Sequence, residues 1–216
     1  MPSVQSKIEE AGGIQGNHAA TIGSICHRVL EGWDFRGTRE GLQESVNLAI
    51  KWAIATGKIK NRTIENLRSQ QFEEQRQSPP YEGGEKGEVT NQVDAIQIQD
   101  VELIRTDVLK ILYGFIDSEA YKELQAADIL GREIPILFQQ DGQIILGTID
   151  LLYKTDNRII IGDYKTDYVT LTDLPARATA YQHQKAIYTE AVNRSLKVDN
   201  PEFKLIFLRI GKMISV

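Results

Sequence analysis

The first half of the chain carries hydrophobic residues at the three- and four-residue spacing of amphipathic helices. Four segments show this spacing: 21–33, 39–56, 61–75 and 100–124. Gly57 is suited to end the second of them. Residues 1–20, rich in Gly, Ala and Gln, are predicted to form an entry loop. Residues 77–92 hold two prolines and three glycines, which indicates a mobile surface loop.

The second half of the chain changes to strand patterns. Three predicted strands cover 133–139, 143–154 and 158–165. Asp141-Gly142 and the polar residues 155–157 are hairpin turn signals, so these strands should form an antiparallel meander. Another amphipathic helix is predicted over 175–196, followed by a strand at 203–210. This order of elements indicates a mixed α/β domain.

Composition narrows the class of protein. A chain of 216 residues fits one domain over 1–216, mainly helical over 21–125 and with its core at 133–210. The single cysteine, Cys26, excludes an internal disulfide and leaves too few thiolates for a four-cysteine iron–sulfur cluster. The sequence shows no membrane span and no signal-peptide pattern, so we expect a cytoplasmic protein. The net charge of -5 argues mildly against a free-standing DNA binder, unless acids that hold a metal or a partner domain account for it.

The candidate chemistry lies on two neighbouring predicted strands. Both faces of 143–154 are apolar, which predicts a central buried strand on which the Asp150 carboxylate needs a partner. Period-two alternation places Asp163 and Lys165 on one face at the end of the next strand. The turn register would bring Asp150 close to Asp163, where two carboxylates about 4 Å apart repel by ~4 kcal/mol at an effective dielectric of about 20. Mg²⁺ or Mn²⁺ would turn that repulsion into binding.

Lys165 completes a group suited to phosphodiester hydrolysis, because its ammonium could orient a water or stabilise charge on a phosphate. A lone aspartate at a strand end is more often a cap or turn former, and a neighbouring lysine usually extends to solvent. The complete D-x12-D-x-K pattern on two buried strands favours the metal site over that structural interpretation.

These residues resemble a motif of the PD-(D/E)xK nuclease superfamily, and specifically of its RecB-like branch. That branch has a Gly-x-[IV]-Asp-[LR] strand followed by an Asp-Tyr-Lys-[ST] strand, which match 147–151 and 163–166 here. The resemblance implies a restriction-endonuclease-like core, with a mixed β-sheet flanked by helices and an N-terminal helical arm. It also implies that Asp150, Asp163 and the backbone carbonyl of Tyr164 are metal ligands, and that Lys165 is the catalytic lysine.

Further motifs match in order. The helix over 24–31 is similar to the family's N-terminal His motif, which implies that His27 completes the metal shell. His27 also lies off the apolar stripe of its helix. Glu133 resembles the first acidic motif and could assist the metal, although an edge-strand acid is an equal alternative. Gln184 and Tyr188 match a Gln-x3-Tyr motif and share a helical face with Tyr181, so we expect them to contact DNA. Packing into the core is the stronger alternative for Tyr181.

The resemblance implies a Mg²⁺- or Mn²⁺-dependent deoxyribonuclease, expected to be an exonuclease. The pattern is closest to the C-terminal nuclease domain of AddA- or RecB-type helicase–nucleases, where a GxxxHxxLE helix opens the domain. DNA and a helicase domain or subunit are therefore the expected partners, in repair or recombination. The alternatives are a catalytically inactive DNA-binding or scaffold module, and a hydrolase of small phosphate esters with a closed pocket.

Overall fold

The computed structural model describes residues 4–59, 88–140 and 142–216, and for 4–17, 88–99 and 140 it describes the backbone alone. Its helices are α1 (Val4–Gly32), α2 (Arg39–Ala55), α4 (Glu88–Ile116), α5 (Glu119–Ala126), α6 (Leu174–Ala180) and α7 (Gln182–Leu196). Its strands are β1 (Asp128–Gln140), β2 (Gln143–Thr155), β3 (Arg158–Lys165), β4 (Glu202–Phe207) and β5 (Lys212–Ser215). The predicted helix at 61–75 and most of the predicted loop at 77–92 lie outside the described residues.

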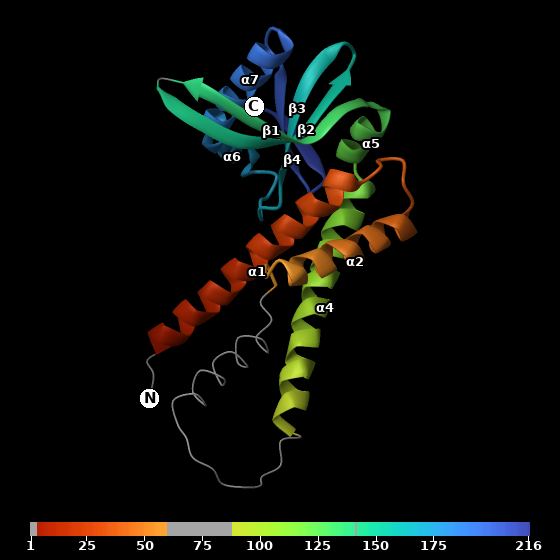
Figure 1. Ribbon diagram of the computed structural model, residues 1–216, viewed down its shortest axis with the longest axis vertical. Helices are drawn as coiled ribbons and strands as arrows, with labels where there is room; N and C mark the ends of the chain where they lie inside the picture. The colour runs from red at the N-terminus through yellow and green to blue at the C-terminus, as the bar shows by residue number, and fades with distance from the viewer. Residues whose placement is uncertain (1–3, 60–87, 141) are drawn as a thin grey trace.

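Within these ranges the strands form one five-stranded sheet in the order β1-β2-β3-β4-β5 (Figure 1). The β1, β2 and β3 strands make the predicted antiparallel meander. The β4 strand runs parallel to β3, because the chain returns through α6 and α7 before it pairs again, and β5 is antiparallel to β4. The predicted mixed α/β fold is confirmed.

The sheet is covered on both faces. One hydrophobic cluster joins α1, α2, α4 and α5 to one face, through strand residues such as Leu151, Tyr153 and Ile160. A second cluster joins α7 to the other face, through Ile149 and Ile161 among others. The α1, α2 and α4 helices extend away from the sheet as the predicted helical arm (Figure 1). None of the described helices combines the length and hydropathy needed to cross a bilayer.

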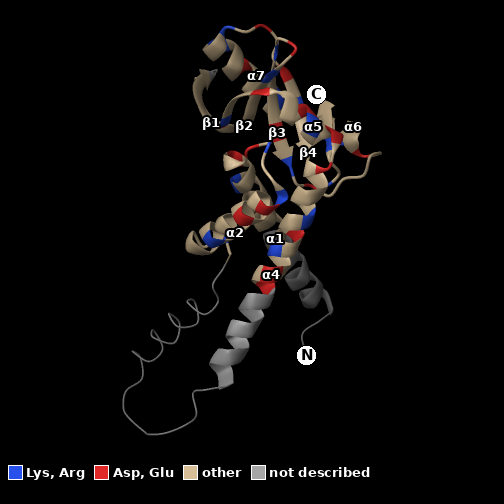
Figure 2. Ribbon diagram, turned by 90° about the vertical axis from the view of Figure 1, so that its right-hand side faces the viewer, with Lys and Arg blue, Asp and Glu red and all other residues tan. Residues whose placement is uncertain are grey.

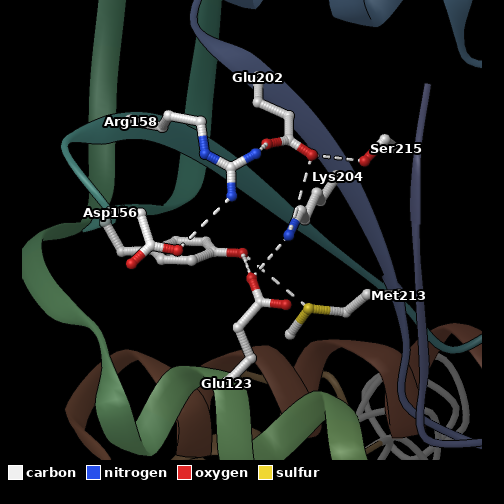
Figure 3. Close-up of polar contacts among 8 residues, drawn as sticks. Glu123, Asp156, Arg158, Glu202, Lys204, Met213 and Ser215 are labelled. Atoms are coloured by element: carbon white, nitrogen blue, oxygen red, sulfur yellow. Dashed lines mark hydrogen bonds and ion pairs between the residues drawn. The ribbon is translucent and has the colours of Figure 1, made fainter.

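A polar network fixes α5 to the sheet within the first cluster. Glu123 on α5 accepts a hydrogen bond from the Tyr153 hydroxyl at 2.9 Å and one from Lys204 Nζ at 2.7 Å, both through Oε1. Lys204 also lies 3.8 Å from Glu202, which pairs with Arg158 at 3.2 Å (Figure 3). These contacts join α5 to the β2, β3 and β4 strands.

Several predicted helix boundaries are wrong. The predicted entry loop at 1–20 is helical from Val4, because α1 continues toward the N-terminus from its buried part. Residues 88–92, predicted as loop, begin α4. The predicted helix over 100–124 is two helices, since Ser118 leaves the helical conformation and its side chain caps α5 by accepting from the Tyr121 N–H. The predicted helix over 175–196 is likewise broken at Tyr181.

The strands also differ from their predictions in extent. The β1 strand begins at Asp128 instead of 133, and the predicted strand at 203–210 ends at Phe207, followed by the unpredicted β5. The β2 strand is buried only from Ile149 to Tyr153, whereas Ile144 and Leu146 are about 70% exposed. Periodicity could not reveal this difference, because it depends on where the neighbouring helices end.

Candidate active site

The β2 and β3 strands separate at the two candidate aspartates. Their pairing runs from Thr155↔Arg158 to Leu151↔Gly162 and ends before Asp150 and Asp163. In place of the next ladder contact, the backbone N–H of Tyr164 donates to Asp150 Oδ2 at 2.7 Å. Asp150 is 8% exposed and Asp163 3%, so both carboxylates are buried where the two strands separate.

His27 and Glu133 approach Asp150 from two other elements. His27 on α1 places Nδ1 3.5 Å from Asp150 Oδ1. Ligand atoms of His27, Glu133 on β1 and Asp150 on β2 all lie within 4.8 Å of one another. The His27 ring also contacts the Tyr164 ring edge-on, with centroids 5.8 Å apart. The α1 helix thus meets strands that lie more than 100 residues later in the chain. This places His27 and Glu133 beside Asp150, where the resemblance predicted that they would contribute to a metal site.

Glu133 reaches this position through an unusual backbone conformation. Its φ is +46°, in the left-handed region that a residue with a Cβ rarely occupies. The neighbours Arg132 and Ile134 pair with Leu151 and Ile149, whereas Glu133 and Asp150 between them do not appear in the ladder. Strain of this kind costs on the order of 1–3 kcal/mol and is concentrated at functional sites. Here it accompanies the approach of the Glu133 carboxylate to Asp150 and His27.

Asp163 and Lys165 form the second part of the site. Lys165 Nζ lies 2.6 Å from Asp163 Oδ2. Gln184 on α7 bridges the pair, since its Nε2 donates to Asp163 Oδ1 at 2.6 Å and its Oε1 accepts from Lys165 Nζ at 3.2 Å. Asp163 is therefore turned toward Lys165 and α7, and it lies outside the three-residue group of His27, Glu133 and Asp150.

Tyr181, at the break between α6 and α7, and Tyr188 on α7 lie on this side of the site. Tyr181 lies under Lys165, with Nζ 4.1 Å from the ring centroid, and its hydroxyl donates to Asp167 at 2.8 Å. Tyr188 contacts Gly147, where an added Cβ would lie 3.3 Å from the ring. Both rings also pack against the α7 side of the core. Tyr181, Gln184 and Tyr188 thus gather at one side of the site, although the helix predicted to carry all three is broken at Tyr181 and only Gln184 and Tyr188 lie on α7.

The carboxylates of the site repel one another, and this repulsion changes their pKa values. Burial and the Asp150 charge raise the pKa of Glu133. Burial raises the pKa of Asp163 against the opposing effect of Lys165, and Asp150 raises it further. Burial disfavours the charged form of His27, but its contact with Asp150 and the charges of Asp150, Glu133 and Asp163 outweigh burial and raise its pKa. A cation among these carboxylates would relieve the repulsion between them.

The position of α1 depends on Gly23, for which the sequence motifs predicted no role. A Cβ at Gly23 would lie only 2.9 Å from Thr166 Oγ1, so α1 packs closely against the chain just after Lys165. His27 follows Gly23 by one helical turn. The signal in the sequence is a glycine inside an otherwise apolar helical stripe. Cys26, next to His27, is fully buried, and burial raises its pKa to about 12, so it is a core residue.

The donor set fits a divalent metal. Two carboxylates and an imidazole offer the oxygen and nitrogen ligands that Mg²⁺ and Mn²⁺ accept, and His27 and Glu133 also line an open cleft of about 420 Å³. A model of the PD-(D/E)XK nuclease superfamily matches residues 6–215. The chain belongs to the PD-(D/E)XK nuclease superfamily.

This membership confirms the predicted restriction-endonuclease-like fold and the superfamily. PD-(D/E)XK nucleases cleave nucleic acids with the help of divalent metals, so a nucleic acid substrate and a metal cofactor follow for this chain. A search of curated proteins finds no match to the sequence.

Proposed function

We propose that this chain is a metal-dependent deoxyribonuclease that hydrolyses phosphodiester bonds. The observation that carries the proposal is the convergence of His27, Glu133 and Asp150 beside the Asp163–Lys165 pair. His27, Asp150, Asp163 and the Tyr164 carbonyl are the proposed ligands, with Glu133 assisting. When bound, Mg²⁺ or Mn²⁺ would supply Lewis-acid stabilisation of charge at the phosphate and promote ionisation of the attacking water.

Lys165 is the proposed catalytic lysine. Hydrolysis joins a water oxygen to phosphorus and releases the sugar oxygen, and negative charge accumulates on the phosphate. The Lys165 ammonium, only 16% exposed and held by Asp163 and Gln184, is positioned to stabilise that charge or orient the water. In this arrangement Asp163 also serves Lys165 directly, because their atoms lie 2.6 Å apart. Gln184, Tyr188 and Tyr181 are the proposed DNA contacts on the α7 side.

We further propose that the chain is RecB-like and is the nuclease domain of a cytoplasmic helicase–nuclease in DNA repair or recombination. The 147–151, 163–166 and 184–188 motifs support this assignment. A helicase would deliver an unwound strand, and digestion from an end would make the domain an exonuclease. The helicase partner, the pathway and the exonuclease mode can each be tested separately from the hydrolysis reaction.

The test is digestion of end-labelled single- and double-stranded DNA with Mg²⁺, with Mn²⁺ and with EDTA. Lys165→Ala and Asp163→Ala are compared with Lys122→Ala, a matched control whose lysine makes an exposed ion pair with Glu119. Cleavage that needs metal, is lost in both site variants and persists in the control supports the proposal. Retained DNA binding with no cleavage under any metal favours the inactive-module alternative instead. End-labelled ladders and circular substrates separate exonuclease from endonuclease action.

A further inference from the structure

Trp52 on α2 lies beside the candidate site without belonging to it. Its half-exposed ring lines the same 420 Å³ cleft as His27 and Glu133. Two exposed cations lie over this ring: the Arg28 guanidinium carbon is 5.6 Å from its centroid and Lys58 Nζ is 5.4 Å from it. An aromatic face flanked by cations thus borders the metal-binding group on the side away from α7.

The groove continues past Trp52. An adjoining cleft of about 450 Å³ between α1 and α2 is lined by Leu48 and Ser45, and it shares Trp52, Arg28 and Glu31 with the first. Leu48 is 65% exposed. The two clefts together form a path along α1 and α2 that leads to His27 and Glu133, with Trp52 at the point where they meet.

The chemistry of this path matches an unpaired nucleic acid strand. Lysine and arginine neutralise phosphates, and an aromatic ring offers a face on which a base can stack. Both cations are on long, exposed side chains. Arg28 is paired with Glu31, and Lys58 has a 3.5 Å contact with Ser24. Exposed pairs of this kind contribute little, so both side chains can exchange their present contacts for a phosphate at small cost. A duplex would not use the ring, because its bases already stack on one another.

We propose that Trp52, with Arg28 and Lys58, forms a stacking subsite for an unpaired nucleotide of a DNA strand that enters the active site along α1 and α2. This inference rests on the proposed nuclease function and adds the substrate form and its direction of approach. It places strand binding on the opposite side of the site from Gln184, Tyr188 and Tyr181. The subsite binds bases irrespective of sequence, since every base has an aromatic face.

Intrinsic fluorescence tests the subsite without cleavage. The chain has two tryptophans, and Trp33 is buried and donates to the Tyr121 hydroxyl, so Trp52 is the exposed reporter. Titration with oligothymidylate in EDTA should quench the emission, and Trp52→Phe should abolish the quenching. We expect Trp52→Leu to weaken single-strand binding about tenfold while blunt duplex binding changes less than about twofold. Arg28→Gln and Lys58→Gln should each lower the salt dependence of binding by about 0.7 in log–log slope.

Tyr113→Leu is the matched control, because Tyr113 also carries a cation, Arg39 at 5.2 Å, but lines neither cleft. Single-strand binding that is equal in wild type, Trp52→Leu and Tyr113→Leu would overturn the subsite, as would binding without quenching. Because Trp52→Phe retains a ring, its quenching result holds even where Trp52→Leu does not fold. Metal-dependent cleavage together with unaltered binding in Trp52→Leu would reject the subsite alone. Quenching without cleavage would reject the nuclease proposal and leave the strand-binding site.

Discussion

The Asp150 carboxylate accepts a hydrogen bond from the backbone N–H of Tyr164 at 2.7 Å. This contact occupies the place where the β2–β3 ladder ends, so it satisfies a buried backbone donor that has lost its strand partner. It also fixes Oδ2 and leaves Oδ1 directed toward His27. The Asp150 side chain therefore links β2 to β3 where their backbone pairing ends, and it also supplies an oxygen atom to the candidate metal site.

These two roles of Asp150 can be separated by substitution. Asn keeps an oxygen that accepts from Tyr164 but lacks the charge, whereas Ala leaves the buried N–H unsatisfied, at a cost of about 1–3 kcal/mol. We expect Asp150→Ala to be less stable than Asp150→Asn by that amount in urea unfolding with EDTA. Mg²⁺ or Mn²⁺ should raise the melting temperature of the wild type and of neither variant. Equal stability of the two variants would show that the Tyr164 contact contributes nothing.

Gln184 is expected to act by positioning Lys165 and Asp163, because it contacts both. Gln184→Ala should lower kcat by about 10–100-fold, a typical cost of losing a residue that orients a metal or catalytic group, and raise KM for DNA by a smaller factor. Gln182→Ala, an exposed neighbour on α7, is the control. A raised KM with unchanged kcat would instead identify Gln184 as the DNA contact predicted from the sequence.

The close contact of Gly23 with Thr166 predicts coupling between the two positions. Ala is about 1 kcal/mol more favourable than Gly in a helix, but its Cβ would meet Thr166 Oγ1. Gly23→Ala should therefore raise the unfolding free energy in a Thr166→Ala background and fail to do so in the wild type. A double-mutant cycle by urea unfolding measures this difference. Strict additivity would mean that Thr166 simply rotates away.

Glu123 should matter for stability and not for chemistry, since its partners Tyr153 and Lys204 are not among the candidate site residues. Figure 3 shows this network. Glu123→Ala removes the shortest polar contact of each partner and leaves Tyr153 with Met213 Sδ at 3.9 Å and Lys204 with Glu202 at 3.8 Å. We expect this loss to cost about 1–3 kcal/mol. That corresponds to a fall of roughly 2–12 °C in melting temperature for a chain of this size. Lys122→Ala, which breaks an exposed pair, should change stability by less than about 0.5 kcal/mol. Loss of cleavage by folded Glu123→Ala would contradict this assignment.

Surface charge alone would not have located the site. Lysines, arginines and acids are interspersed along the described helices and strands (Figure 2). The charges that identify the site are those of Asp150 and Asp163, which are buried. They could be recognised in the sequence because they are carboxylates within apolar strands. The net charge of -5 includes these acids, which is one reason why it argued only mildly against DNA binding.

The sequence by itself determined the meander, the helical face of α7 and the placement of Asp163 beside Lys165. Each follows from local periodicity, because the geometry of a strand or helix decides which nearby residues share a face. The turn signals at 141–142 and 155–157 then set which strands pair. The motif spacing adds His27, Glu133 and Gln184 as candidates, but it leaves open which of them meet.

Only the tertiary structure decided which of these residues contact one another. It brings His27 and Glu133 to Asp150, turns Asp163 to Lys165 and Gln184, and gives Glu133 its positive φ. It also ends the covered part of β2 at Ile149 and places Trp52 in the cleft. These features depend on how α1, α2 and α7 pack against the sheet. Such packing joins residues far apart in the chain, and no local pattern encodes the contacts that it creates.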